Sequence, residues 1–186
     1  EYIAKKFKIK DQVMLIYNDK ISVSPITTHL SIKDVPKKIN KEKIISNILK
    51  INNFYKYNFN KIPMIAVLGL NPHCETIHNS SEEKKEIIPA IKYLSKKKLK
   101  IHGPFSTDTF FLNKNIEFYD VVIGMYHDQV LTPLKTLYNF NAVNLTIGLP
   151  FVRISPDHGP NKNMIGKKIS DPASIFCAMN LFNKIK

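Results

Sequence analysis

Short apolar runs alternate along this chain with longer segments in which apolar residues recur at helical spacing. Two strand-like runs, QVMLIY at residues 12–17 and KISVSPIT at residues 20–27, are separated by the turn formers Asn18 and Asp19. This pattern predicts a β-hairpin. The uniformly apolar run MIAVLGL at residues 64–70 is typical of a strand that is covered on both faces.

Three further runs predict strands in the second half of the chain: KIHG at residues 100–103, DVVIGMY at 120–126 and AVNLTIG at 142–148. Short helices are expected around TDTFF at residues 107–111 and after HDQV at residues 127–130. Strands that alternate with helices indicate an α/β fold with a largely parallel sheet flanked by helices.

Three longer helices are predicted from their start signals. Asn40 is a good N-cap for a helix through residues 41–56, in which isoleucine and leucine recur at helical spacing. Ser80 and Glu83 have the spacing of a capping box before a helix over residues 82–97, with a kink expected near Pro89. Asp171 followed by Pro172 predicts the start of a last helix.

The composition is that of a globular protein with a strong positive charge. The 186 residues are 44% hydrophobic, which is enough for a substantial core, and the formal net charge is +13. The lysines are scattered among isoleucines and asparagines, residues that share A/T-rich codons, and they lack the interleaved arginines and aromatics of a base-reading surface. We therefore expect no nucleic-acid partner.

Other classes of protein are disfavoured by simple absences in the sequence. Cys74 and Cys177 form no C-x-x-C pair, so the sequence predicts neither a disulfide framework nor a thiolate zinc site. No apolar run approaches the roughly 20 residues of a membrane span, and no signal peptide stands at the start. These features favour the cytoplasm. The opening EYIAKKF is typical of the middle of a helix, and we expect the chain to begin inside a longer protein.

Four polar clusters follow predicted strands, and three of them contain a histidine. The clusters are TTHL, NPHC, GPFSTDT and MYHDQ, and they supply His29, His73, His127, Asp108 and Asp128. Ligands collect at the carboxyl ends of strands in α/β sheets. Three imidazoles with a carboxylate nearby predict a divalent-metal site with an open coordination position.

The alternative is that each histidine is only a hydrogen-bonded surface or core residue, as most single strand-end histidines are. Histidine is not rare in this chain, because His78, His102 and His158 also occur, outside these four clusters. Spacing alone leaves the two interpretations about equally supported.

Arg153 is the only arginine in a chain that otherwise uses lysine. An arginine in that setting suggests a need for its planar, bidentate guanidinium, to hold a phosphate or a carboxylate. Lys135 and Asn144 are the other candidates for holding an anion. A surface ion pair is the simpler explanation for Arg153 alone.

Six motifs, in order, resemble the C-terminal part of the 4-hydroxythreonine-4-phosphate dehydrogenase family. They are TTHL, GLNPH, GPFSTDTFF, YDVVIGMYHDQVLTPLK, VNLTIGLPFVR and DHGPNKNMIGKK. The resemblance runs along essentially the whole chain. It implies an isocitrate/isopropylmalate dehydrogenase-like fold that is incomplete because its N-terminal part is missing. It also implies a metal-binding and dimerisation region at residues 1–122, and a return into the NAD- and substrate-binding domain at residues 123–186.

The resemblance also implies a site and its cofactors. A divalent metal, Zn, Mg or Co, would be bound by histidines from both subunits of a homodimer. The implied metal ligands are His29, His73 and His127; the implied catalytic residues are Asp128, Asp108 and Lys135; the implied substrate ligands are Lys135, Asn144 and Arg153; and the implied contacts to NAD, or to NADP, are His158, Gly159 and Asn161. Asp128 is our guess for the proton acceptor.

The implied reaction oxidises and decarboxylates 4-phosphooxy-L-threonine to 3-amino-2-oxopropyl phosphate, in the biosynthesis of pyridoxal 5′-phosphate (vitamin B6). A metal Lewis acid suits it because it lowers the pKa of the substrate hydroxyl. Two alternatives stay open: a related dehydrogenase that acts on another phosphorylated hydroxy acid, and a truncated, inactive dimerisation remnant.

Three positions depart from the pattern of the family. Glu75 stands where the family has a glycine beside the metal ligand, Pro160 replaces a threonine, and Asn139 replaces a glycine. Asparagine tolerates a positive φ better than most residues, so the third change is the mildest.

Overall fold

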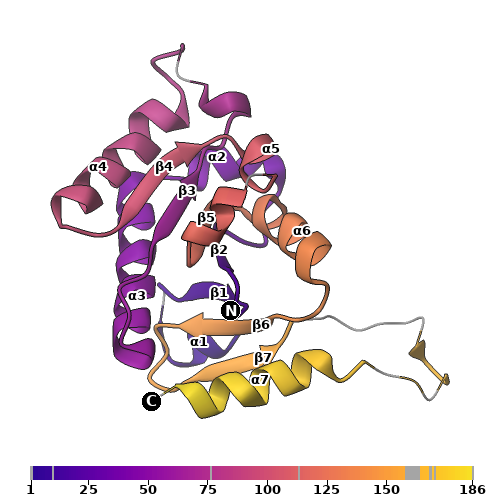
Figure 1. Ribbon diagram of the computed structural model, residues 1–186. Helices are drawn as coiled ribbons and strands as arrows, with labels where there is room; N and C mark the ends of the chain where they lie inside the picture. Colours follow the sequence, from indigo (N-terminus) through magenta and orange to yellow (C-terminus); the bar gives the residue numbers. More distant parts are fainter. Residues whose placement is uncertain are drawn as a thin grey trace.

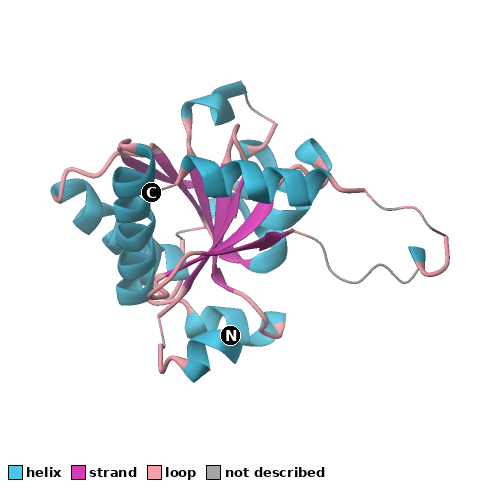
Figure 2. Cartoon of the chain, turned by 90° about the horizontal axis from the view of Figure 1, so that it is seen from below, coloured by secondary structure: helices cyan, strands magenta, loops and turns pink. Residues whose placement is uncertain are grey.

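The computed structural model describes residues 2–9, 11–75, 77–112, 114–157, 164–167, 169 and 171–185. Within these ranges the chain forms one seven-stranded sheet in the order β4-β3-β5-β2-β1-β6-β7. Helices cover both faces of this sheet (Figures 1 and 2). No described helix is both long enough and apolar enough to cross a membrane.

The sheet is parallel in one half and antiparallel in the other. The strands are β1 (Val13–Tyr17), β2 (Ser22–Thr27), β3 (Ile65–Leu68), β4 (Ile101–Phe105), β5 (Val121–Tyr126), β6 (Val143–Ile147) and β7 (Arg153–Pro156). β4, β3, β5 and β2 run parallel to their neighbours, whereas β2–β1, β1–β6 and β6–β7 are antiparallel pairs. The predicted hairpin is confirmed by the antiparallel β1–β2 pair. The further antiparallel pairs β1–β6 and β6–β7 make the sheet mixed rather than largely parallel.

One face of the sheet packs against α3 (Lys41–Phe59), α4 (Ile88–Lys96) and α7 (Ala173–Lys184). The N-cap prediction for α3 is confirmed, because the Asn40 side chain accepts a hydrogen bond from the Lys43 N–H at 2.8 Å. Ile44 and Ile48 of α3 are fully buried against strand residues such as Ile65. This face holds the larger part of the core.

The other face packs against α5 (Thr107–Phe110) and α6 (His127–Tyr138), where Val130 and Leu134 cover Ala66 and Val122. Two short helices are α1 (Tyr2–Lys6) and α2 (Val35–Lys38), and Val35 of α2 is buried in the core on the α3 face of the sheet. α6 begins at His127 itself, earlier than the sequence pattern predicts. His127 therefore projects from the junction of strand and helix.

The predicted capping box at Ser80 and Glu83 is wrong. Glu83 is fully buried and accepts hydrogen bonds from the backbone N–H groups of Leu70 and Asn71, at 2.7 and 2.8 Å. The Ser81 hydroxyl, not that of Ser80, lies 3.4 Å from the Lys84 N–H. The Glu83 carboxylate bonds to the loop at residues 70–71 and not to the start of its own helix, because the two backbone N–H groups of that loop need an acceptor.

The helix with Pro89 opens on a π-helical turn, η3 (Glu83–Ile87), which runs directly into α4. Pro89 has no N–H to continue the ladder of hydrogen bonds, and the wider turn ahead of it agrees with the kink expected there. At the last helix, α7 starts at Ala173, one residue after the predicted Pro172. The Asp171 carboxylate accepts from the Ala173 N–H at 2.9 Å, so Asp171 still caps the helix from outside.

Candidate functional site

The carboxyl ends of β2, β3, β4 and β5 meet at one edge of the sheet because these four strands run in the same direction. His29 follows β2, and His127 follows β5 directly. His73 lies in a short turn after β3, η2 (Pro72–Cys74), and Asp108 lies in α5 after β4. The topology thus brings all four segments to the same edge, as the sequence predicts.

His29 and His127 lie side by side at this edge. The centroids of their rings are 6.0 Å apart, and the ring planes are inclined by 35°. Two imidazoles on one tetrahedral ion, with metal–nitrogen bonds of about 2.0–2.1 Å, have centroids roughly 5 Å apart. The separation of the two rings is therefore close to that of two ligands of one divalent ion.

Asp128 orients the ring of His127. The Nδ1 atom of His127 lies 2.6 Å from Oδ1 of Asp128, so Nδ1–H donates to the carboxylate and Nε2 is left to bind a ligand. A carboxylate behind a histidine fixes the tautomer and the orientation of the ring in many metal sites.

His73 lies next to Asp108, so a carboxylate stands beside its ring, as Asp128 stands beside the ring of His127. Nδ1 of His73 is 3.5 Å from Oδ2 of Asp108, and both side chains are exposed. A 2.6 Å hydrogen bond from the Ser106 hydroxyl, assisted by the charge of His73, holds the pKa of Asp108 below its ordinary value. Asp108 is thus kept as a carboxylate.

The described residues of a single chain do not bring the three histidines together: among them, no group of three His, Cys, Asp or Glu side chains is close enough to hold a metal ion. The structure instead has two separate pairs, His29 with His127 and His73 with Asp108. Imidazole and carboxylate donors suit a divalent transition metal. An ion bound by the first pair needs its remaining ligands from elsewhere.

A small cavity of about 130 Å³ adjoins the first pair. His29, Asn144 and Arg153 line it, together with Gln12, Met14, Thr28 and Thr146. The pairing of β6 with β7 sets Arg153 opposite Thr146, to whose hydroxyl its guanidinium donates at 3.0 Å. The structure therefore joins two of the predicted anion-binding residues to a predicted metal ligand.

Lys135, the third predicted anion-binding residue, does not line this cavity. It lies in the last turn of α6, where its ammonium donates to the carbonyl of Asp157 at 2.9 Å and lies 3.3 Å from the carboxylate of that residue. The ammonium also lies 5.4 Å from the ring centroid of Phe140.

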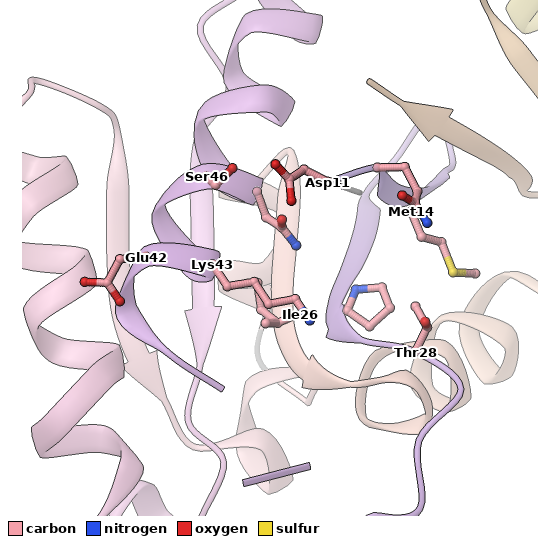
Figure 3. A pocket seen from close by; sticks show the side chains of 10 residues that line it. Asp11, Met14, Ile26, Thr28, Glu42, Lys43 and Ser46 are labelled. Carbon is pink, nitrogen blue, oxygen red and sulfur yellow. The ribbon is translucent and has the colours of Figure 1, made fainter. Parts of the chain in front are cut away.

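A larger cavity of about 510 Å³ adjoins the small one and shares Gln12, Met14 and Thr28 with it. Figure 3 shows Lys43 reaching into this cavity from α3 toward Ile26. Burial, together with the charge of Lys38, lowers the pKa of Lys43. Sequence reasoning missed this cavity because nothing in the pattern sets Lys43 apart from the other lysines of its helix.

Sequence reasoning also missed two buried polar side chains, Glu83 and Gln129, that hydrogen-bond to the backbone of the loops at this edge. Gly69 and Gly124 make room for them. A Cβ on Gly69 would lie 3.1 Å from Oε1 of Glu83, and a Cβ on Gly124 would lie 2.9 Å from Oε1 of Gln129.

The departures from the family pattern are accommodated where the structure describes them. Glu75 has φ −49°, so a glycine is not required at that position, and the left-handed residues of the turn are His73 and Cys74, both with φ 55°. Asn139 ends α6 with φ 52° and ψ −127°. Asparagine tolerates a positive φ, but glycine adopts this combination of angles most easily. The predicted nucleotide contacts His158, Gly159 and Asn161, and also Pro160, lie outside the described residues.

Comparisons with known proteins agree on one family. A model of the family "Pyridoxal phosphate biosynthetic protein PdxA" matches residues 1–182. The chain is 45% identical over 183 residues to the 4-hydroxythreonine-4-phosphate dehydrogenase of Sulfurihydrogenibium sp., with 97% of this chain and 56% of that protein covered. It is 40% identical to the enzyme of the same name from Aquifex aeolicus, with 100% of this chain and 58% of that protein covered.

Solved structures give the same result. The crystal structure of the 4-hydroxythreonine-4-phosphate dehydrogenase of Klebsiella pneumoniae matches 98% of this chain and 55% of its own chain, with a TM-score of 0.78 and 32% identity. The chain thus spans a little more than half the length of the relatives that it matches.

Proposed function

The chain belongs to the family of the pyridoxal phosphate biosynthetic protein PdxA, and we propose from this that the protein containing it is a 4-hydroxythreonine-4-phosphate dehydrogenase. The reaction would be oxidation of 4-phosphooxy-L-threonine by NAD, or by NADP, followed by decarboxylation to 3-amino-2-oxopropyl phosphate. The proposal includes the isocitrate/isopropylmalate dehydrogenase-like fold and a place in the cytoplasm.

This proposal rests on one observation: the His29–His127 pair adjoins the cavity that Asn144 and Arg153 line. A divalent ion held by the histidines would supply the Lewis acidity that eases loss of the proton from the substrate hydroxyl. Arg153 and Asn144 would hold the phosphate or carboxylate of the same substrate by hydrogen bonds. Asp128 fixes the tautomer of His127 and would be within reach of a released proton.

We further propose that a second copy of the chain completes the site. His29 and His127 of one subunit would meet His73 and Asp108 of the other, which explains why one chain separates the two pairs. Large apolar side chains flank these loops in exposed positions: Leu30 is 41%, Ile32 68%, Ile77 81% and Leu112 84% exposed. A partner subunit would bury such side chains, as homodimer interfaces do.

Lys135 keeps its proposed role in substrate binding and catalysis as a prediction. Its present partner, Asp157, ends the described stretch after β7, and the proposed nucleotide contacts His158, Gly159 and Asn161 follow it in the sequence. Lys135 would thus stand between the substrate and the nucleotide.

The competing hypothesis is an inactive dimerisation remnant, and the coverage of little more than half of each relative favours it. The test uses the product of the complete reading frame that contains these residues, with a divalent metal, NAD and 4-phosphooxy-L-threonine. Formation of NADH, with KM raised at least tenfold in Arg153→Lys because the bidentate fork is lost, supports the proposal. A folded, metal-loaded dimer that reduces neither NAD nor NADP with this substrate would refute it. That result is expected of the remnant, and also of a related dehydrogenase that acts on another phosphorylated hydroxy acid.

A further inference from the structure

The Gln129 side chain lies at the centre of the site edge without being a candidate ligand. It stands in the first turn of α6, two residues after His127, and is only 5% exposed. Buried amides need hydrogen-bond partners, because a carboxamide left unsatisfied in the interior is costly. The partners of Gln129 show what this residue holds together.

All three of its partners belong to segments that carry site residues. Oε1 accepts from the Met125 N–H at 2.6 Å, at the end of β5. Nε2 donates to the Gly69 carbonyl at 2.6 Å, after β3, and to the Thr107 hydroxyl at 2.8 Å, at the start of α5. One carboxamide therefore ties together the segments that lead to His127, His73 and Asp108; α5, α6 and the ends of β3 and β5 lie close together in Figure 1.

The chemistry of these partners allows only one orientation of the carboxamide. A backbone N–H can only donate, so the oxygen must face Met125, and a backbone carbonyl can only accept, so the nitrogen must face Gly69. Glutamate at this position would set a carboxylate oxygen against that carbonyl. Methionine would keep the length of the side chain and lose all three hydrogen bonds.

Glu83 holds the His73 segment from its other side. Its carboxylate accepts from the N–H groups of Leu70 and Asn71 and from the Asn71 side chain at 2.8 Å. The backbone at residues 69–71 is thus bonded to Gln129 through a carbonyl and to Glu83 through two N–H groups. The segment that leads into η2 and His73 is fixed at both edges.

We propose that Gln129 is a positioning residue of the site, which sets the loops of His73 and Asp108 at a fixed offset from His127. This inference rests on the proposed function, because the position of these loops relative to His127 affects metal affinity only if His127, His73 and Asp108 belong to metal sites. Residues that hold metal ligands in place typically contribute about 10–100-fold to metal affinity.

The test compares Gln129→Glu and Gln129→Met with the unchanged chain in two measurements. Calorimetric titration with Zn²⁺ should show affinity reduced about 10–100-fold. Amide hydrogen exchange, measured without metal, should become at least about tenfold faster at residues 70–74 and 107–110, with β6 unchanged. Thr107→Val should speed exchange at residues 107–110 alone. Thr107→Ser, which keeps the hydroxyl, should exchange at the rates of the unchanged chain.

The control is Tyr55→Phe, which removes a buried 2.9 Å hydrogen bond to Ser22 on the opposite edge of the sheet. It should lower the melting temperature and leave both Zn²⁺ affinity and loop exchange unchanged. Folded Gln129 variants with unchanged exchange, or with Zn²⁺ affinity equal to that of the unchanged chain, would overturn the inference. If the unchanged chain binds no Zn²⁺, the proposed metal site fails instead, and the exchange rates alone decide the role of Gln129.

Discussion

The carboxylate of Asp108 accepts a hydrogen bond from the neighbouring Ser106 hydroxyl. The Ser106 hydrogen bond is the main cause of its lowered pKa, with His73 contributing less. We expect Ser106→Ala to raise the pKa of Asp108 toward the ordinary value, and Ser106→Thr, which keeps the hydroxyl, to leave it low. NMR titration of the Asp108 carboxyl carbon measures this; equal pKa values in the chain and in Ser106→Ala would contradict the assignment.

The sign of the linked effect on stability follows from the direction of this shift. Because folding lowers the pKa of Asp108, its carboxylate favours the folded state above the ordinary pKa, and that contribution is lost as the pH falls through the lowered value. The side chain is exposed, so solvent screens the effect and keeps it small.

Gly124 is constrained by the two side chains that follow it on α6. An added Cβ would lie 2.4 Å from Cγ1 of Val130 and 2.9 Å from Oε1 of Gln129. We expect Gly124→Ala to reduce the free energy of unfolding by about 1–3 kcal/mol, as overpacking a core does. Chemical denaturation measures the loss. The double variant Gly124→Ala/Val130→Ala should regain part of it; no loss in the single variant would contradict the packing at this strand end.

At the scale of residues, the sequence identifies side chains that can bind a ligand more readily than it identifies the side chains that hold those ligand-binding groups in place. His29, His73 and His127 stand out because all three follow predicted strands, at the positions where ligands collect in α/β sheets. Gln129 and Glu83 do not stand out, since their roles depend on partners up to 60 residues away, such as the Gly69 carbonyl. Only the folded sheet brings such partners within hydrogen-bond distance.

At the scale of elements, α3 shows how much an N-cap residue contributes to the stability of the protein. At the start of this helix the Asn40 side chain accepts from the Lys43 N–H at 2.8 Å, and the Glu86 carboxylate accepts from the Lys41 N–H at 2.6 Å. We expect Asn40→Ala to reduce the free energy of unfolding by about 1 kcal/mol and Asn40→Asp to leave it nearly unchanged. Thermal unfolding of both variants measures this; equal melting temperatures for Asn40→Ala and the original chain would show that the cap contributes nothing.

Helices with local start signals were easier to predict than the relations between elements. The Asn40 cap and the hairpin at Asn18 and Asp19 are decided by neighbours in the sequence. The arrangement around Glu83, where the predicted capping box fails, and the mixed sheet are not decided by neighbours in the sequence. Glu83 is captured by a loop more than ten residues away, and the reversed strands follow from which edges pair after collapse.

At the scale of the whole molecule, the central claim is that two incomplete pairs form one site. Motifs in the sequence indicate the three histidines, and the fold brings all three to one edge of the sheet, but the described part of the chain leaves His73 with Asp108 and not with His29 and His127. A single sequence carries no signal for contacts between two copies. The grouping of the ligands therefore has to be measured.

Mixing of inactive variants measures it most directly. His29→Ala and His73→Ala should each bind no Zn²⁺ tightly. Unfolded and refolded together in equal amounts, they should recover about a quarter of the original sites, because half of the randomly paired dimers are mixed and one of the two sites in each is intact. A mixture of His29→Ala with His127→Ala should recover none. Recovery in neither mixture, or in both equally, would contradict a site in which His29 and His127 of one subunit join His73 of the other.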